Sequence, residues 1–232
     1  MKKARYAVID YRAAERVKNE LLKYACEIIP TVRQNTYESI CGHADIQLCR
    51  IDDKTAVCAP NCYEYYKNHL SGVNIVCGEK NPSGSYPGDV LYNACCAESF
   101  AMHNFKYTDG AVLRAAQKRF KRFVNVKQGY SCCASCATGD FVITEDDGIY
   151  NALLKNNIKA LKISSGSVEL PGMNYGFFGG ATGFFGGVVF TVGEIDKHTD
   201  FEIIGKFLGN KNIDIVSLCS GKLRDTGSVL FF

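Results

Sequence analysis

The sequence contains no tryptophan, only five prolines and only three methionines among its 232 residues. It also has no run of the roughly 20 apolar residues that a membrane-spanning helix requires. Near the N-terminus, the apolar part of residues 4–9 is too short and too soon interrupted for a signal peptide. These absences predict a cytoplasmic protein that has no membrane partner.

An excess of charge of one sign is also missing. The 27 basic and 24 acidic side chains give a formal net charge of +3. This near balance favours neither nucleic acid nor a membrane surface as a partner. The basic run Lys118–Arg122 falls at the end of a predicted helix, where basic residues complement the helix dipole. We therefore expect a small-molecule ligand as the partner, and the sequence leaves the oligomeric state open, a homo-oligomer included.

Cysteine, by contrast, is abundant, with twelve residues. Because the sequence shows no export signal, we expect reduced thiols and no structural disulfides. Cys133 and Cys136 form a C-x-x-C pair, but a second pair at zinc-finger spacing and a thioredoxin-like context are both missing. The sequence therefore predicts neither a metal site nor another cofactor.

The main positive feature is an internal repeat. Glycines at positions 42, 88, 129, 176 and 227 each begin a short strand-like stretch, at separations of 41 to 51 residues. After the first four of these stretches we predict a second strand, a helix and a third strand. The predicted second strands are 55–59, 99–103, 140–144 and 188–192, and the predicted third strands are 73–77, 122–126, 158–163 and 212–218. The predicted helix starts are Asn61, Thr108 or Asp109, Asp146 and Thr199, residue types that cap helices.

The fifth unit is divided between the two ends of the chain. Residues 227–232 form an opening strand with nothing after it, and the missing pieces stand at the N-terminus. There, residues 4–9 are predicted as the second strand, Asp10 as a cap, 13–24 as a helix and 26–30 as the third strand. Pairing of the last strand with the first would close a ring and remove exposed sheet edges.

The repeat therefore predicts an α/β fold, in which residues 1–232 form a single domain. We expect a five-unit, pseudo-symmetric α/β propeller that is closed by the N- and C-terminal segments. The alternative is a generic α/β domain in which the glycine spacing is a coincidence.

The stretch richest in chemistry is Gly42-His43-Ala44-Asp45, which begins the first unit. In a strand, His43 and Asp45 would point to the same face of the sheet, because side chains alternate. The pKa of an ordinary histidine allows proton exchange near neutral pH, and a nearby carboxylate can orient the ring or bind a cation. The alternative is a hydrogen-bonded histidine beside a turn.

Five units of strands plus a helix, with a GHxD motif on an opening strand, resemble the pentein fold of the guanidino-group-modifying enzymes. Arginine deiminases, agmatine deiminases and dimethylarginine hydrolases have this fold, and the chain as a whole resembles an uncharacterised bacterial family assigned to it. The resemblance in architecture covers the whole chain, whereas the motifs cover only short stretches. In these enzymes a cysteine of the last unit attacks the guanidine carbon, the GHxD histidine transfers protons and carboxylates hold the guanidinium.

This chain departs from the order of those motifs, because its last strand has no cysteine and its GHxD lies in the first unit. A circular shift reconciles the two orders. The unit before GHADI is then the last one, where D-x-G-S-V-L-F, beginning at Asp225, resembles D-G-G-D-V-L-F. Two units after GHADI stands the sequence 129–133, G-Y-S-C-C, which resembles the end of dimethylarginine hydrolases. A competing alignment places Asp89 on the acidic motif.

The resemblance implies Cys133 as the nucleophile, with Cys132 second, and His43 as the proton-transfer residue. A reactive cysteine needs its thiolate form, and a nearby His43 imidazolium or Lys127 would lower the pKa of the thiol. The alternative is that these cysteines pack as small hydrophobic residues, as free cysteine commonly does.

The same resemblance implies Asp45, Asp225 and Asp89 as carboxylates that bind a cationic substrate, since paired carboxylates satisfy the donors of a guanidinium. Asp225 and Asp89 each have an alternative role as a turn residue. We therefore expect a cysteine-dependent hydrolase that acts on C–N bonds of a guanidine or amidine small molecule. The alternative is a non-catalytic pentein-fold protein that binds a cationic or polar small molecule, and fold alone does not decide between them.

Overall fold

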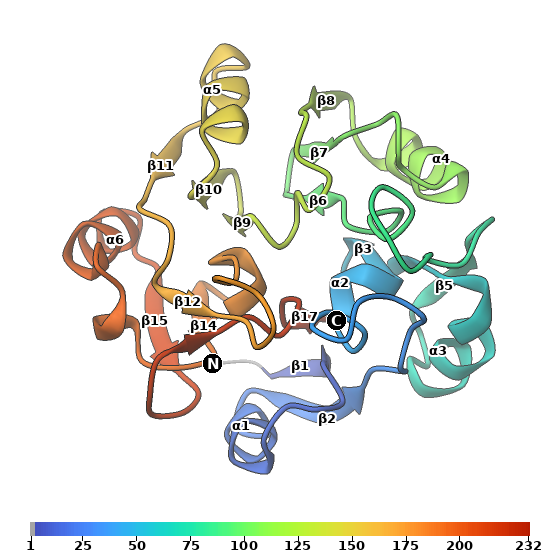
Figure 1. Cartoon of the computed structure of the whole chain (residues 1–232), viewed down its shortest axis with the longest axis horizontal. Helices are drawn as coiled ribbons and strands as arrows, with labels where there is room; N and C mark the ends of the chain where they lie inside the picture. The colour runs from blue at the N-terminus through green and yellow to red at the C-terminus, as the bar shows by residue number, and fades with distance from the viewer. Residues whose placement is uncertain (1–2) are drawn as a thin grey trace.

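The computed structural model describes residues 3–232, so Met1 and Lys2 of the expected domain 1–232 lie outside the described residues. Figure 1 shows strands gathered around the centre of the molecule and the longer helices at its periphery. Within residues 3–232, the strands form five three-stranded sheets and one two-stranded sheet, none of which closes on itself. None of the described helices combines the length and the apolar character that crossing a membrane requires.

Each three-stranded sheet has the same order: an opening strand, a middle strand antiparallel to it and an outer strand parallel to the middle one. In that order the sheets are β3 (Leu48–Asp52), β4 (Thr55–Cys58) and β5 (Asn74–Cys77); β6 (Cys95–Cys96), β7 (Phe100–His103) and β8 (Arg122–Asn125); β9 (Ser135–Thr138), β10 (Phe141–Thr144) and β11 (Ala160–Lys162); β13 (Thr182–Phe185), β14 (Val188–Thr191) and β15 (Asp214–Ser217); β17 (Leu230–Phe231), β1 (Ala4–Ile9) and β2 (Ala25–Pro30). The two-stranded sheet pairs β12 (Val168–Glu169) with β16 (Leu223–Arg224).

A helix connects each middle strand to its outer strand, as parallel pairing requires. These helices are α1 (Glu15–Leu21), α3 (Tyr63–His69), α4 (Gly110–Arg119), α5 (Asp147–Lys155) and α6 (Phe201–Gly209), and the shorter helical turns are α2 (Ala44–Gln47), η1 (Pro60–Cys62), η2 (Gly179–Ala181) and η3 (Ile195–Lys197). Two of the predicted caps are confirmed, because Asp109 accepts from the amide of Ala111 and Asp146 from that of Ile149, both at 2.8 Å. The cap of α6 is Asp200 and not Thr199.

The predicted pairing of the two ends of the chain is confirmed. β17 lies antiparallel to β1, with Ala7 opposite Phe231 and Val8 opposite Leu230, and β2 pairs with the other edge of β1. The ring of Phe231 lies 5.5 Å from that of Phe185 and 5.1 Å from that of Phe190, so the last strand also packs into the core shared with β13 and β14.

Two local predictions at the start of the chain are wrong. His43 and Asp45 do not lie in a strand, because His43 is the N-cap residue of α2 and Asp45 lies in its first turn. The amide of Asp45 donates to the carbonyl of Gly227 at 3.1 Å, a contact that fixes a helical turn here and delays β3 until Leu48. Asp10 does not cap α1, whose N-cap residue is Ala14. The Asp10 carboxylate accepts instead from the Arg12 guanidinium at 2.6 Å.

The twelve cysteines are all free in the structure. We therefore expect a thiol titration of the denatured protein, made without reductant, to find about twelve reactive thiols per chain. Protection of one or more pairs of cysteines would contradict this prediction and would indicate an oxidising location.

Candidate active site

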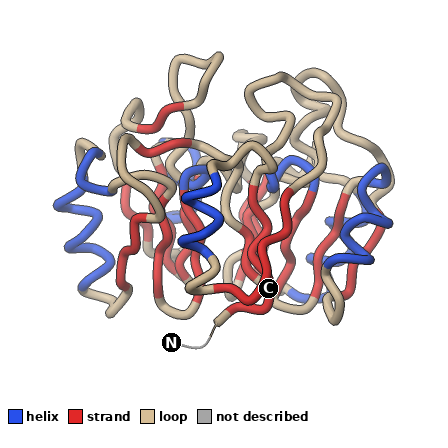
Figure 2. The backbone as a smooth tube through the Cα atoms, turned by 90° about the horizontal axis from the view of Figure 1, so that it is seen from below, coloured by secondary structure: helices blue, strands red, loops and turns tan. Residues whose placement is uncertain are grey.

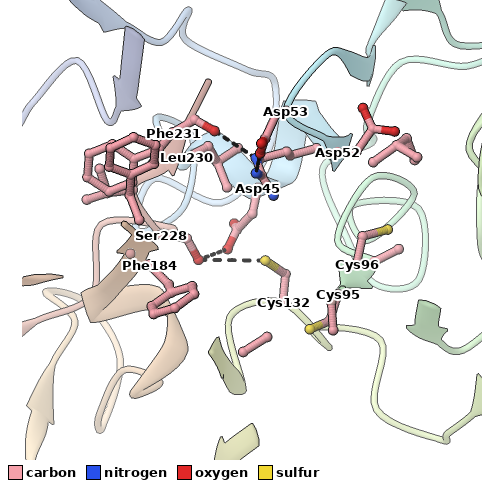
Figure 3. Close-up of a pocket in the computed structure, with 18 of the residues that line it drawn as sticks. Asp45, Asp52, Asp53, Cys95, Cys96, Cys132, Phe184, Ser228, Leu230 and Phe231 are labelled. Carbon is pink, nitrogen blue, oxygen red and sulfur yellow. Dashed lines mark hydrogen bonds and ion pairs between the residues drawn. The ribbon is translucent and has the colours of Figure 1, made fainter. Parts of the chain in front are cut away.

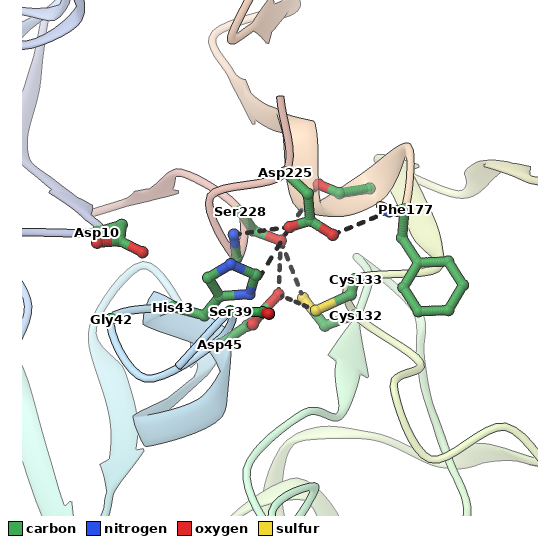
Figure 4. Close-up of polar contacts among 12 residues, drawn as sticks. Asp10, Ser39, Gly42, His43, Asp45, Cys132, Cys133, Phe177, Asp225 and Ser228 are labelled. Atoms are coloured by element: carbon green, nitrogen blue, oxygen red, sulfur yellow. Dashed lines mark hydrogen bonds and ion pairs between the residues drawn. The ribbon is translucent and has the colours of Figure 1, made fainter. Parts of the chain in front are cut away.

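Long loops gather at one end of the strands (Figure 2). The opening strands begin at this end and the middle strands finish there, because the two run antiparallel. The segments that precede β3, β6, β9, β13 and β17 each supply a member of one buried hydrogen-bonded cluster. Figure 4 shows its main residues, which lie up to 183 positions apart in the sequence.

The thiol of Cys133 is held by two polar side chains. It donates to Asp45 Oδ2 at 3.0 Å and accepts from Asn93 Nδ2 at 3.2 Å. The Asn93 side-chain oxygen accepts from the backbone amides of Cys132 and Cys133 at 2.9 and 3.2 Å. Asn93 therefore fixes both the backbone and the thiol of the candidate nucleophile, a role that the sequence prediction missed.

Asp45 links this thiol to the C-terminal segment. Its Oδ2 also accepts from the Ser228 hydroxyl at 2.9 Å, whereas its Oδ1 is buried and has no partner among residues 3–232. Burial raises the pKa of Asp45 to about 6, although the hydrogen bonds from Cys133 and Ser228 oppose this shift. The Asp45 carboxyl group therefore gains or loses its proton close to neutral pH.

The imidazole of His43 is enclosed by the protein. It is 1% exposed, and neither ring nitrogen has a hydrogen-bond partner in the part of the chain that the structure describes. Its Nδ1 lies 3.7 Å from Asp225 Oδ1. Burial lowers the pKa of His43, and the charges of Asp225 and Asp10 only partly oppose this, so the ring is neutral at pH 7. A neutral imidazole can accept a proton.

A nitrogen of His43, an oxygen of Asp45 and the sulfur of Cys133 all lie within 4.8 Å of one another. The structure therefore brings together three of the residues to which the resemblance assigned catalytic or substrate-binding roles. Imidazole, carboxylate and thiolate are also ligands of zinc, but binding a metal here would require loss of the thiol proton that Asp45 accepts in its hydrogen bond.

Asp225 is placed behind His43 by two backbone amides. Its Oδ2 accepts from the amide of Phe177 and its Oδ1 from the amide of Gly227, both at 2.9 Å. Burial raises the pKa of Asp225. Glycine is needed at position 180, because a Cβ atom there would lie 2.0 Å from Asp225 Oδ1. The glycine-rich segment before β13 thus makes room for a buried carboxylate.

Glu145 is a further buried carboxylate that the sequence prediction missed. Its Oε1 accepts from the amide of Phe178 at 3.1 Å, next to the amide that holds Asp225, and its Oε2 has no partner among the described residues. Burial raises the pKa of Glu145 to about 7, and the charge of Asp225 adds to the shift. In the sequence, Glu145 is recognisable as an acid that directly follows a middle strand. However, Asp146 and Asp147 come next, and the whole acidic segment was interpreted as the start of a helix.

The pH dependence of stability reports on Glu145. The folded protein holds the Glu145 proton more tightly than the unfolded chain, whose pKa is 4.5, so stability falls as the pH rises from about 4.5 to about 7. Glu145→Gln cannot lose this proton and keeps the contact to Phe178. The unfolding free energy of the variant minus that of wild type should therefore be larger at pH 8 than at pH 5, by on the order of 2 kcal/mol. Chemical denaturation at the two pH values measures this gain, and equal pH dependence in both proteins would contradict the prediction.

The expected lowering of the thiol pKa is wrong for this structure. Burial raises the pKa of Cys133 well above its ordinary value, and the carboxylates of Asp45 and Asp225 raise it further. His43 supplies no positive charge, because its own pKa is lowered. Lys127 lies exposed, and its ammonium makes no hydrogen bond or ion pair to any residue from 3 to 232. The unliganded thiol is therefore protonated at neutral pH.

The two remaining candidates lie at the edge of the cluster. Asp89 Oδ2 accepts from the Tyr130 hydroxyl at 2.5 Å, and its Oδ1 is buried and has no partner within the described chain. Cys132 is partly exposed, and its sulfur lies 3.8 Å from the Ser228 hydroxyl.

A cavity of about 760 Å³ reaches the cluster. Its inner end is lined by Asp45, Cys132 and Ser228, and its outer wall includes the turns between opening and middle strands, such as residues 52–55 (Figure 3). A second cavity, of about 550 Å³, ends at Asp225 and Thr226. The two cavities therefore meet the site at different residues, the first at Asp45 and the second at Asp225, whereas His43 and Cys133 line neither cavity.

Comparison with known proteins agrees with this architecture. A family model described as "Family of unknown function (DUF6873)" matches residues 8–230. A solved structure titled "C. Jejuni Agmatine Deiminase" is similar, with a TM-score of 0.52 and 9% sequence identity, over 93% of this chain and 88% of that chain. No curated protein sequence matches the chain. At this identity the likeness concerns the mixed α/β fold alone.

Proposed function

We propose that this chain, which belongs to the family of unknown function DUF6873, is a cysteine-dependent hydrolase that acts on a guanidine or amidine small molecule. In this proposal, residues 1–232 form one domain of the pentein superfamily and act in the cytoplasm. The five three-stranded sheets are the five units of a pseudo-symmetric propeller, which the pairing of β17 with β1 closes. The likeness in fold to the agmatine deiminase structure supports this assignment.

The observation that carries the proposal is the meeting of a thiol, an imidazole and a carboxylate in one buried cluster. The polar atoms of His43, Asp45 and Cys133 lie within 4.8 Å of one another, although Cys133 lies 88 positions from Asp45 in the sequence. Burying several polar groups that lack full hydrogen bonding costs free energy, and such sites are commonly functional. Both ring nitrogens of His43 and the Oδ1 atom of Asp45 have no hydrogen-bond partner among the described residues, as expected if a bound ligand supplies these hydrogen bonds.

The proposed chemistry uses the substrate's own charge to activate the thiol. A guanidinium bound between Asp45 and Asp225 would replace the hydrogen bond from the Cys133 thiol to Asp45, and its positive charge would lower the pKa of the thiol. The thiol proton then passes to the neutral His43 imidazole, which lies within 4.8 Å of the sulfur. Positioning and desolvation by the buried cluster add to this activation.

The reaction then proceeds in two steps. The Cys133 thiolate adds to the guanidine carbon, a C–N bond breaks and His43 donates its proton to the departing ammonia or amine. A water molecule, deprotonated by His43, adds to the same carbon, and the C–S bond breaks to return the thiolate. The net reaction consumes one water and converts a guanidine into a urea derivative and ammonia or an amine.

A second function has a specific observation in its favour. The raised pKa of Cys133 and the lowered pKa of His43 leave both groups uncharged in the unliganded protein. The same carboxylates would still bind a cationic or polar small molecule in a protein that does not catalyse its reaction.

Labelling with 2-chloroacetamidine separates the two functions. Its cationic amidine should bind the carboxylates and alkylate the nearby thiol with loss of chloride, so we expect Cys133 to react faster than the exposed Cys26 and Cys77. Peptide mass spectrometry after short reaction times measures the three rates. His43→Ala should slow the labelling of Cys133, and Cys132→Ser, as the matched control, should leave it in place. A Cys133 that reacts more slowly than Cys26 and Cys77 would favour the non-catalytic binding protein.

A further inference from the structure

The second cavity is a groove with a charged wall. It lies between the N-terminal segment around α1 and the β12–β16 pair, and its volume is about 550 Å³. Four basic and four acidic residues line it: Arg12, Arg16, Lys222, Arg224, Asp10, Glu38, Glu169 and Asp225. Because basic and acidic residues are equal in number, whether the groove attracts an anion or a cation depends on which of these charges already form ion pairs within the protein.

Most of these charges have a partner within the protein. The Arg12 guanidinium binds the Asp10 carboxylate at 2.6 Å, and Lys222 lies 3.5 Å from Glu169. Glu38 pairs with Arg33, which does not line the groove, at 2.6 Å. All three pairs neutralise charge locally and leave little for a ligand to bind.

Arg16 and Arg224 are the basic residues without such a partner, whereas the buried acid Asp225 accepts hydrogen bonds from the backbone amides of Phe177 and Gly227. Both arginine side chains are exposed, and neither guanidinium has an ion pair or hydrogen bond to any residue from 3 to 232. Arg16 comes from α1 and Arg224 from β16, so they line the same groove from different elements. Two unpaired guanidinium groups present planar sets of donors that match the oxygens of a carboxylate or a phosphate.

The inner end of the groove has an unsatisfied hydroxyl. Thr226 is 6% exposed, and its Oγ1 is buried without a hydrogen-bond partner among the described residues. It lines the groove beside Asp225. A buried polar atom of this kind costs free energy unless something hydrogen-bonds to it, and a ligand in the groove would do so.

We propose that this groove binds the carboxylate or phosphate group of a small organic molecule, with Arg16 and Arg224 as the anion-binding residues and the Thr226 hydroxyl as a further contact. The site is distinct from the cavity that reaches Asp45 and Cys132, and it does not depend on the chemistry of Cys133. Neutral analogues of the ligand bind more weakly, because they lack the charge that the two guanidinium groups complement.

Ligand-detected NMR at constant ionic strength tests the site, with butyrate, methyl phosphate and the uncharged butyramide as probes. We expect an anion to bind with a dissociation constant in roughly the millimolar range. Arg16→Gln and Arg224→Gln should each weaken binding about tenfold, the loss expected for one charge-assisted hydrogen-bonding partner. Arg224→Lys should recover part of the affinity, since it restores the charge without the planar set of donors.

Lys222→Gln is the matched control. This residue lines the same groove but is paired with Glu169, so its replacement should change the affinity less than about twofold. Selective binding of butyrate identifies a carboxylate ligand, and selective binding of methyl phosphate identifies a phosphate ligand. The proposal is overturned if butyramide binds as well as the anions, if neither anion binds, or if Arg16→Gln and Arg224→Gln bind anions like wild type. Anion binding should persist in Cys133→Ser, whether or not this variant has hydrolase activity. This result would show that the anion site does not depend on the proposed hydrolase reaction.

Discussion

Cys133→Ser should lower the rate of ammonia or amine release from a guanidine substrate by on the order of 10⁴-fold or more, because a serine hydroxyl in this position cannot supply an equivalent nucleophile. The hydroxyl can keep the hydrogen bonds that the thiol makes to Asp45 and Asn93, so the change tests chemistry with little change in packing. A panel of guanidines and amidines, assayed with wild type for released ammonia or amine, provides the substrate for this measurement.

Cys132→Ser is the matched control for this experiment. In the wild-type protein, the Cys132 sulfur lies 3.8 Å from the Ser228 hydroxyl and makes no hydrogen bond to Asp45. We expect it to keep activity within about tenfold of wild type, since it loses no group that reacts in the proposed mechanism. Equal loss of activity in the two variants would contradict the assignment of Cys133 as the nucleophile, and full activity in Cys133→Ser would rule out the proposed mechanism.

Gly227→Ala should lower the free energy of unfolding by about 3 kcal/mol, from two effects that add. The backbone of Gly227 has a φ of +69°, a conformation that alanine adopts only with strain. A Cβ atom there would also lie 2.1 Å from the Cβ of His43, so the histidine would have to move. Chemical denaturation measures the loss of stability, and we expect the chloroacetamidine labelling of Cys133 to slow as well.

Gly205→Ala provides the comparison. Gly205 lies within α6, its φ is not positive and nothing lies within 4 Å of a Cβ atom placed on it. Alanine should stabilise this helix by about 0.5–1 kcal/mol, since glycine is the poorer helix former. The prediction for Gly227 would fail if both variants changed stability in the same direction and by similar amounts.

The repeat could be predicted from the sequence because its signals are local. The middle strands 55–59 and 99–103 are apolar runs of strand length, and the structure has strands at Thr55–Cys58 and Phe100–His103. Asp109 and Asp146 cap the helices they were expected to cap, since a short side chain reaches the nearest free amides. The division of the fifth unit between the two ends of the chain followed from the same pattern, and the pairing of β17 with β1 confirms it.

The spatial meeting of His43, Asp45 and Cys133 could be anticipated, but their environment could not. The structure places Asp45 in a helical turn because its amide binds the carbonyl of Gly227, far away in the sequence. Asn93 was missed for the same reason, since the groups that it binds belong to the preceding and the following unit.

The sequence by itself thus determined the repeated order of middle strand, helix and outer strand and the joining of the chain ends, because apolar runs, caps and a repeated glycine frame are readable along the chain. It also identified three of the residues that meet at the cluster, His43, Asp45 and Cys133. Only the tertiary structure decided the charges at that cluster. The protonation of Cys133, the neutral ring of His43 and the raised pKa of Glu145 all follow from burial, which depends on which segments close over each side chain. That Arg16 and Arg224 have no partner among residues 3–232 was decided in the same way, since pairing depends on which side chains the fold brings close to each guanidinium.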